Sequence, residues 1–145
     1  MTEPPPPDCT ETVDLIFVLD ASGSIDAVGF EQMKELVSRI VSTLDIEGGH
    51  ARVGLLTFSS TVDARFNLST YTTRADVQAA TAELSYSAGR TNTGAALAHV
   101  RQVMLLPAAG ARQQVPNVVV VMTDAGSNDR RATLVSFVTL TTMYA

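Results

Sequence analysis

The sequence of 145 residues is poor in the residue types that zinc and disulfide chemistry need. It contains one cysteine, Cys9, which has no second cysteine in the chain to pair with. Its two histidines, His50 and His99, have no second histidine or cysteine nearby at the spacing of a zinc site. We therefore expect both histidines to be surface residues and expect no zinc centre.

Basic residues and long apolar runs are also scarce. The 10 lysines and arginines are outnumbered by 15 aspartates and glutamates, which gives a net charge of −5. This balance offers no general attraction for nucleic acid or an anionic membrane. No apolar run is long enough to span a bilayer, so we expect no membrane insertion. A hydrophobic content of 46% is typical of a globular core, and the length fits one domain.

The first ten residues lack both the basic and the apolar parts of a signal peptide. Four consecutive prolines, Pro4–Pro7, favour polyproline II and are typical of a stiff linker. We therefore interpret residues 1–10 as a proline-rich linker and residues 11–145 as one domain. A domain cut from a longer secreted protein would begin this way, and so would an intact cytosolic protein.

Recognisable catalytic motifs are missing as well. The sequence has no Gly-x-x-x-x-Gly-Lys-Ser/Thr phosphate loop and no Gly-x-Ser-x-Gly nucleophile elbow. Asp20 follows an apolar run, as in haloacid dehalogenase-type enzymes, but Ser22 stands where they need a second aspartate. Neither histidine is placed to activate a nucleophile. We therefore expect no catalytic residues.

The sequence does contain apolar strands alternating with amphipathic helices. Strands are predicted at Val13–Leu19, Arg52–Phe58, Ala64–Phe66 and Val118–Met122. Helices are predicted at 27–44, with Asp26 as the N-cap, and at 94–106, with Thr93 stabilising its start. A further helix is predicted to follow a capping box that begins at Thr73. Only a turn joins the second and third strands, which requires antiparallel pairing. The alternation predicts a doubly wound, mostly parallel α/β sheet with one short antiparallel edge strand and helices on both faces.

Hard oxygen ligands follow two of these strands. Asp20, Ser22 and Ser24 occupy alternate positions behind the first strand, and Asp124 follows the last one. Thr91 lies between them, in a turn-rich loop before a helix. Ligands of such sheets bind beyond the carboxyl ends of the strands, where we expect these three loops to meet. Carboxylate and hydroxyl oxygens suit a small, hard cation.

This arrangement resembles the von Willebrand factor A domain, also called the integrin I-type domain. In that family Asp-x-Ser-x-Ser, a distal Thr and a distal Asp form the metal-ion-dependent adhesion site (MIDAS). The matching metal ligands here are Asp20, Ser22, Ser24, Thr91 and Asp124. The resemblance runs from about Cys9 to Asp129 and implies a Rossmann-like fold that binds no organic cofactor.

The resemblance also implies the metal and the partner. The expected ion is Mg²⁺, with Mn²⁺ and Ca²⁺ as alternatives. An outer-shell Asp124 would leave the ion incompletely compensated, so that a Glu or Asp of a protein partner completes its coordination. The implied partner is collagen or another matrix or cell-surface protein, and the implied setting is extracellular, within a longer secreted protein. A glycosylation sequon at Asn67 mildly supports secretion. An intracellular assembly platform and a structural domain without metal stay open.

The end of the sequence departs from the family pattern. Ala125 stands where glycine is usual, and residues 130–145 replace two strands and a long final helix. The family pattern favours a helix there, whereas the β-branched residues of 134–142 favour a strand. We expect a helix and an incomplete domain, in which Val118–Met122 becomes an exposed edge and the chain is marginally stable or dimeric. In extracellular members a cysteine placed like Cys9 pairs beyond the last helix, so its partner would lie downstream; a free thiol is the alternative.

Overall fold

The computed structural model describes residues 12–123 and 138–142. Several predicted features lie outside these residues. They are the proline-rich segment with Cys9, the predicted ligand Asp124 with Ala125, and residues 130–137 of the predicted final helix. Within the described residues, no helix combines the length and the apolar character that crossing a membrane requires.

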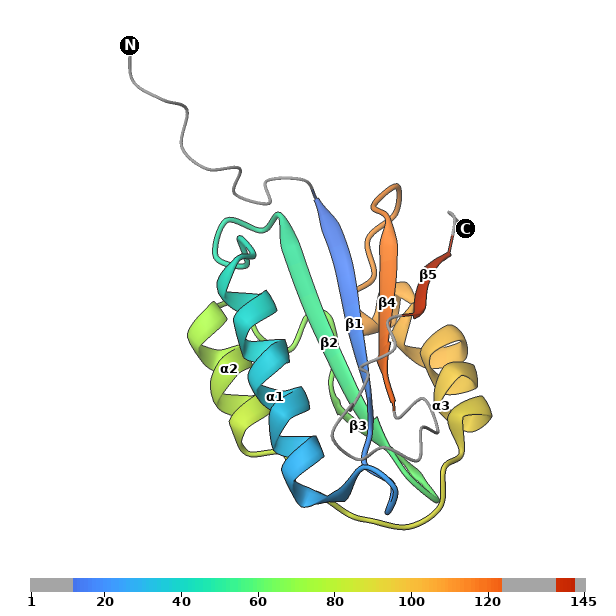
Figure 1. The fold of residues 1–145 in the computed structure, drawn as a ribbon. Helices are drawn as coiled ribbons and strands as arrows, with labels where there is room; N and C mark the ends of the chain where they lie inside the picture. The colour runs from blue at the N-terminus through green and yellow to red at the C-terminus, as the bar shows by residue number, and fades with distance from the viewer. Residues whose placement is uncertain (1–11, 124–137, 143–145) are drawn as a thin grey trace.

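The core of the molecule is a five-stranded sheet in the order β3-β2-β1-β4-β5 (Figure 1). Its strands are β1 (Val13–Asp20), β2 (Ala51–Phe58), β3 (Val62–Phe66), β4 (Asn117–Met122) and β5 (Val138–Thr142). The central strand, β1, pairs in parallel with β2 and with β4, while β3 pairs antiparallel with β2. These pairings confirm the doubly wound sheet and the antiparallel third strand predicted from the short turn.

The central strand is buried on both faces, which explains its continuous apolar run. Leu15, Phe17 and Leu19 belong to one hydrophobic cluster, and Ile16 and Val18 belong to a second cluster on the opposite face. Because successive side chains of a strand point to opposite faces, both clusters draw on the same short segment. The covered parallel sheet therefore fixes where β1 ends and where its polar loop begins.

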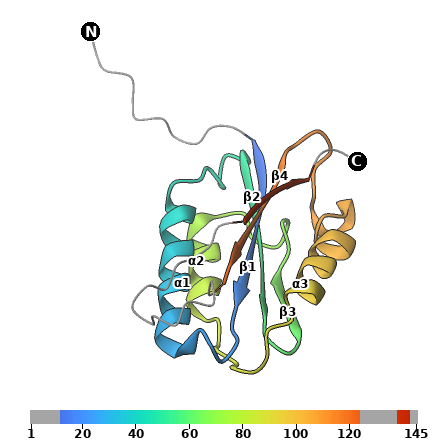
Figure 2. The ribbon, with the colours of Figure 1, turned by 45° about the vertical axis from the view of Figure 1, so that its right-hand side comes forward.

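Helices cover both faces of the sheet (Figure 2). The helices α1 (Asp26–Ser42) and α2 (Arg74–Ala82) lie on one face, and α3 (Thr93–His99) lies on the other. The α3 helix continues into a π-helical turn, η1 (Val100–Met104), and a 3₁₀ turn, η2 (Pro107–Ala109), follows. Gly110 then ends the segment with a left-handed φ of 99°, a conformation that glycine adopts without strain.

The structure confirms Thr73 as an N-cap, whereas Asp26 is the first residue of α1 and Ile25 occupies the N-cap position. The Asp26 carboxylate accepts a hydrogen bond from the Gly29 N–H at 2.8 Å, and the Thr73 hydroxyl accepts one from the Asp76 N–H at 3.1 Å. At α3 the capping side chain is Asn92, whose amide oxygen accepts from the Ala95 N–H at 3.2 Å. Thr93, which was predicted to stabilise this start, is already the first helical residue.

The prediction of a C-terminal helix is wrong for residues 138–142, which form β5 and pair antiparallel with β4. Four of the five residues in Val-Thr-Leu-Thr-Thr are β-branched, and such residues favour strands. The pairing satisfies backbone groups of β4 that would otherwise lie along an edge. The sheet therefore has two antiparallel edge strands rather than one, and β4 is not the exposed edge that was expected.

A buried ion pair fastens the amino end of the sheet. The Asp14 side chain is fully buried in β1, and its Oδ1 accepts from the Arg112 Nε–H at 2.9 Å. The Arg112 backbone N–H donates to Asp14 Oδ2 at 2.7 Å. The guanidinium also donates to the carbonyl oxygens of Val13, Gly49 and His50. One arginine thus neutralises Asp14 and joins the loops that enter β1, β2 and β4.

Candidate metal centre

Asp20, the first predicted ligand, ends β1 and is 1% exposed. The Ser22 backbone N–H donates to Asp20 Oδ1 at 2.8 Å, and the Thr123 hydroxyl donates to Asp20 Oδ2 at 2.7 Å. Thr123 directly follows β4, so the carboxyl ends of two neighbouring parallel strands meet at this carboxylate. The first loop and Thr123 therefore meet at this edge of the sheet, whereas Asp124 lies outside the described residues.

The charge of Asp20 has no cationic partner among the described residues. None of the ion pairs found there involves Asp20, and the two donors to its carboxylate are neutral. A buried carboxylate without a counter-charge is costly, because burial removes its hydration. Among the described residues, the Asp20 carboxylate is therefore held by neutral hydrogen-bond donors alone.

The two serines of the loop lie beside each other. Ser22 is 1% exposed, and its hydroxyl oxygen lies 3.2 Å from that of the exposed Ser24, within hydrogen-bond distance. Together with the bond from the Ser22 N–H to Asp20, this contact gathers the three predicted ligands of the first loop. The hydroxyls reach from a buried to an exposed position, as expected for a site that opens onto the surface.

The loop that carries Thr91 lies against the first loop. The Gly23 N–H donates to the Gly89 carbonyl at 2.9 Å, and the Asn92 N–H donates to the Ser59 carbonyl at 2.9 Å. Thr91 itself is exposed and makes no side-chain hydrogen bond with the described residues. The fold thus brings four of the five predicted ligands onto two adjoining loops.

Gly89 allows this close approach of the two loops. Its φ is +107°, and a Cβ added there would lie 2.9 Å from the Ser60 hydroxyl oxygen. A side chain at this position would therefore suffer both backbone strain and a steric clash. The turn that presents Thr91 depends on glycine at residue 89.

Most of the predicted ligands are hydroxyl groups. Across the residues that the structure describes, no three His, Cys, Asp or Glu side chains gather as a possible metal cage. His50 lies at the opposite end of β2 and pairs with Asp45, whose pKa this hydrogen bond lowers from its ordinary value. His99 lies in α3 and is partly buried, with an Nε2 that has no described partner, so it is not the surface residue that was predicted.

Sequence reasoning missed the groups that hold the loops in place. The Tyr86 hydroxyl donates to the Ser22 carbonyl at 3.0 Å, and the Ser87 hydroxyl donates to the Ser59 hydroxyl at 3.0 Å. Thr123, whose hydroxyl donates to Asp20, was not among the predicted site residues. These contacts join residues far apart in the chain. The sequence offered little indication of these contacts, because Tyr86 and Ser87 are marked only by their position before the turn at Gly89.

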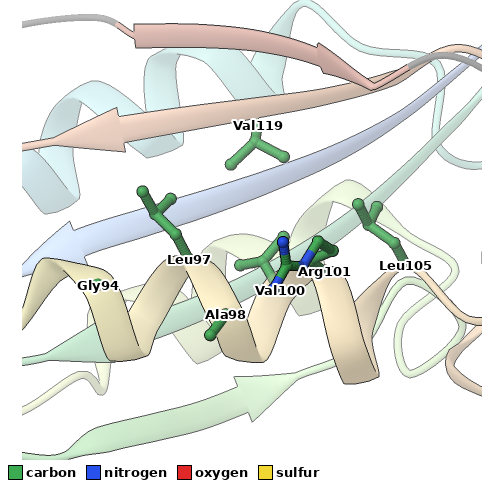
Figure 3. A pocket seen from close by; sticks show the side chains of 7 residues that line it. All are labelled: Gly94, Leu97, Ala98, Val100, Arg101, Leu105 and Val119. Carbon is green, nitrogen blue, oxygen red and sulfur yellow. The ribbon is translucent and has the colours of Figure 1, made fainter.

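A cavity of about 290 Å³ lies elsewhere, between α3, η1 and β4 (Figure 3). Its walls are formed by Gly94, Leu97, Ala98, Val100, Arg101, Leu105 and Val119. These residues offer no side-chain oxygen, so the cavity is unsuited to a hard cation. This cavity is therefore not a candidate for the predicted metal site.

Known proteins are similar to the chain in sequence. Residues 14–138 match the family model for the von Willebrand factor type A domain. The chain is 38% identical to human matrilin-1, in a match that covers 83% of this chain and 24% of matrilin-1. It is 35% identical to the human collagen alpha-1(XX) chain, in a match that covers 80% of this chain and 9% of the collagen chain. It therefore spans about a quarter or less of these two relatives.

Solved structures agree with these relatives. The structure of proximal thread matrix protein 1 from the mussel byssus superposes with a TM-score of 0.76 at 28% identity, over 84% of this chain and 33% of that one. Another structure of the same mussel protein, with a TM-score of 0.72, is described as having a zinc-occupied MIDAS motif. Fold, motif order and sequence similarity agree: the chain belongs to the von Willebrand factor type A domain family.

Proposed function

We propose that this chain is a metal-dependent protein-binding module of the adhesion type. Asp20, Ser22, Ser24, Thr91 and Asp124 would hold a divalent cation, to which a Glu or Asp of a partner protein binds. The observation that carries the proposal is the buried Asp20 carboxylate, which has only neutral hydrogen-bond donors among the described residues. A cation supplies the missing positive charge.

The donor set fits a small, hard cation. Carboxylate and hydroxyl oxygens suit Mg²⁺, which is the ion we propose, with Mn²⁺ and Ca²⁺ as alternatives. The zinc-occupied MIDAS of the mussel protein supports the use of a divalent ion by such a motif. Asp124 lies outside the described residues, and its role is assigned by its position after Thr123.

Each residue would have a distinct task in partner binding. Asp20 anchors the site and is oriented through both of its oxygens. Ser24 and Thr91 are exposed and line the approach from solvent. When bound, the cation supplies an open coordination position and uncompensated positive charge. The protein groups thus confine the ion while leaving room for a partner's carboxylate, and no catalytic step is assigned.

The relatives suggest the setting and the partner. Matrilin-1 and a collagen chain contain similar segments, and the solved neighbour is a thread matrix protein. We propose an extracellular role within a longer protein, with collagen or another matrix or cell-surface protein as the partner. Residues 11–145 would be the binding domain and residues 1–10 its linker. An intracellular assembly platform and a structural domain without metal are the alternatives.

Calorimetric titration with Mg²⁺ and Mn²⁺ tests the metal site, with Asp20→Ala as the matched control. We expect one ion per chain in the parent and no binding in the variant. A folded parent that binds neither ion would contradict the proposal and favour the structural alternative. Immobilised collagen then serves as a first partner probe, with EDTA abolishing any specific binding. Binding that survives EDTA unchanged would contradict the bridging role.

A further inference from the structure

We propose that Tyr86 is a positioning residue for the metal site, which it serves by fixing the backbone of Ser22. This inference rests on the proposed function and deepens it. The Tyr86 hydroxyl donates to the Ser22 carbonyl oxygen at 3.0 Å, across 64 residues of sequence. The Ser22 hydroxyl, which faces Ser24, belongs to the same residue as this carbonyl. A hydrogen bond that fixes the Ser22 backbone therefore also restricts the position of the hydroxyl.

The tyrosine ring is itself held by the core. Its centroid lies 5.8 Å from that of Phe30, with the rings tilted by 44°, and Phe30 is fully buried in α1. A hydroxyl on a ring anchored in this way has little freedom to move. The Ser22 carbonyl also accepts from the Ile25 N–H of its own loop at 3.1 Å, so the phenol adds a second bond, from a distant segment that packs on the core.

The segment around Tyr86 forms hydrogen bonds with the loop that carries Ser22 at more than one position. The Gly89 carbonyl accepts from the Gly23 N–H at 2.9 Å, and the Ser87 hydroxyl donates to Ser59, beside the end of β2. Thr91 follows two residues after Gly89. One short segment therefore sets the first loop and presents the Thr91 hydroxyl, which links the two halves of the ligand set before any ion binds.

Groups that do not bind the metal themselves but orient its ligands contribute strongly to the affinity of the site for the metal. Their loss typically lowers metal affinity about 10- to 100-fold. Tyr86→Phe removes only the hydroxyl and keeps the ring against Phe30. We expect it to bind Mn²⁺ about tenfold more weakly than the parent, while its thermal unfolding midpoint in EDTA stays close to that of the parent.

Tyr71→Phe is the matched control. The Tyr71 ring packs edge-on against Phe66, with centroids 5.1 Å apart, and its hydroxyl makes no hydrogen bond with the described residues. The chain has no tryptophan and three tyrosines, so the long-wavelength band of its near-ultraviolet absorbance reports on tyrosine. We expect a Mn²⁺-induced tyrosine difference signal in the parent and in Tyr71→Phe, and its loss in Tyr86→Phe.

Parental Mn²⁺ affinity in Tyr86→Phe would overturn the inference while leaving the proposed function standing. An unfolding midpoint in EDTA that falls far enough to explain the weaker binding would also overturn it, because the hydroxyl would then be merely structural. Absence of Mn²⁺ binding by the folded parent would overturn the proposed function and this inference together. Weaker binding with an unchanged midpoint and a lost tyrosine signal would support it.

Discussion

The central strand carries two buried aspartates, six positions apart, whose surroundings differ in one respect. Asp14, at the amino end of β1, is neutralised by the Arg112 guanidinium. Asp20, at the carboxyl end, receives only an N–H and a hydroxyl from the described residues. The same side chain is thus part of the permanent structure at one end of the sheet and a candidate ligand at the other. The difference lies in the counter-charge that the fold supplies.

Substitution of Asp20 should have the largest effect on metal binding. We expect Asp20→Ala to reduce Mg²⁺ and Mn²⁺ binding below detection in calorimetry. Its stability in EDTA should be equal to or above that of the parent, because the variant removes a buried carboxylate that has only neutral donors among the described residues. A variant that unfolds more easily than the parent in EDTA would break the comparison.

Substitution of Arg112 should have the opposite profile. Arg112→Ala leaves Asp14 buried and unpaired, which typically costs about 3–5 kcal/mol. We expect this loss in the free energy of unfolding by urea in EDTA. A urea titration of Asp14→Ala provides the companion measurement. Where the variants remain folded, their Mn²⁺ affinity should stay within a factor of about two of the parent's, because the pair lies at the other end of β1.

The serines should produce graded losses that sharpen the picture of the site. We expect Ser22→Ala and Ser24→Ala each to weaken Mn²⁺ binding by about tenfold or more, as is typical when a group of a metal site is removed. Neither should change the unfolding midpoint in EDTA as much as Arg112→Ala does. Parental affinity in both variants would mean that the loop does not ligate the ion through its hydroxyls.

The smallest effect is expected at a partly exposed aspartate, Asp45. The hydrogen bond with His50, and to a lesser extent the one from the Gly48 N–H, lowers the pKa of Asp45 from its ordinary value. A carboxyl group whose pKa is lower in the folded state than in the unfolded state stabilises the fold at pH values above the unfolded-state pKa. This stabilisation is lost as the pH falls through the folded-state pKa. His50→Ala should therefore move acid unfolding slightly toward higher pH. Circular dichroism between pH 5 and about 2 would detect the shift; an unchanged or lower midpoint would count against it.

Local sequence patterns were sufficient to place the predicted ligands of the first loop. Asp20, Ser22 and Ser24 follow a continuous apolar strand, so their placement depends only on where that strand ends. The cap at Thr73 was predictable for the same reason, since its bond spans three residues. The sheet and its antiparallel β3 followed from alternation and from one short turn.

Contacts across long sequence separations were not predictable in this way. The bond between Tyr86 and Ser22 and the pair between Arg112 and Asp14 depend on the completed fold. The C-terminal strand was missed because the family pattern was preferred over local β-propensity. Its position beside β4 shows that an available sheet edge and β-branched residues outweighed the expected helix.

The long separation between Asp20 and Thr123 has a consequence for folding. Pairing β1 with β4 joins Asp14 to Asn117 and Leu19 to Met122, so it closes a loop of about one hundred residues. Such non-local pairing is slow compared with helix or hairpin formation. The second donor to Asp20 is therefore in place only after β4 has docked. We expect the cation site to mature late in folding, so that fast-mixing experiments should detect metal uptake only after most helical structure has formed.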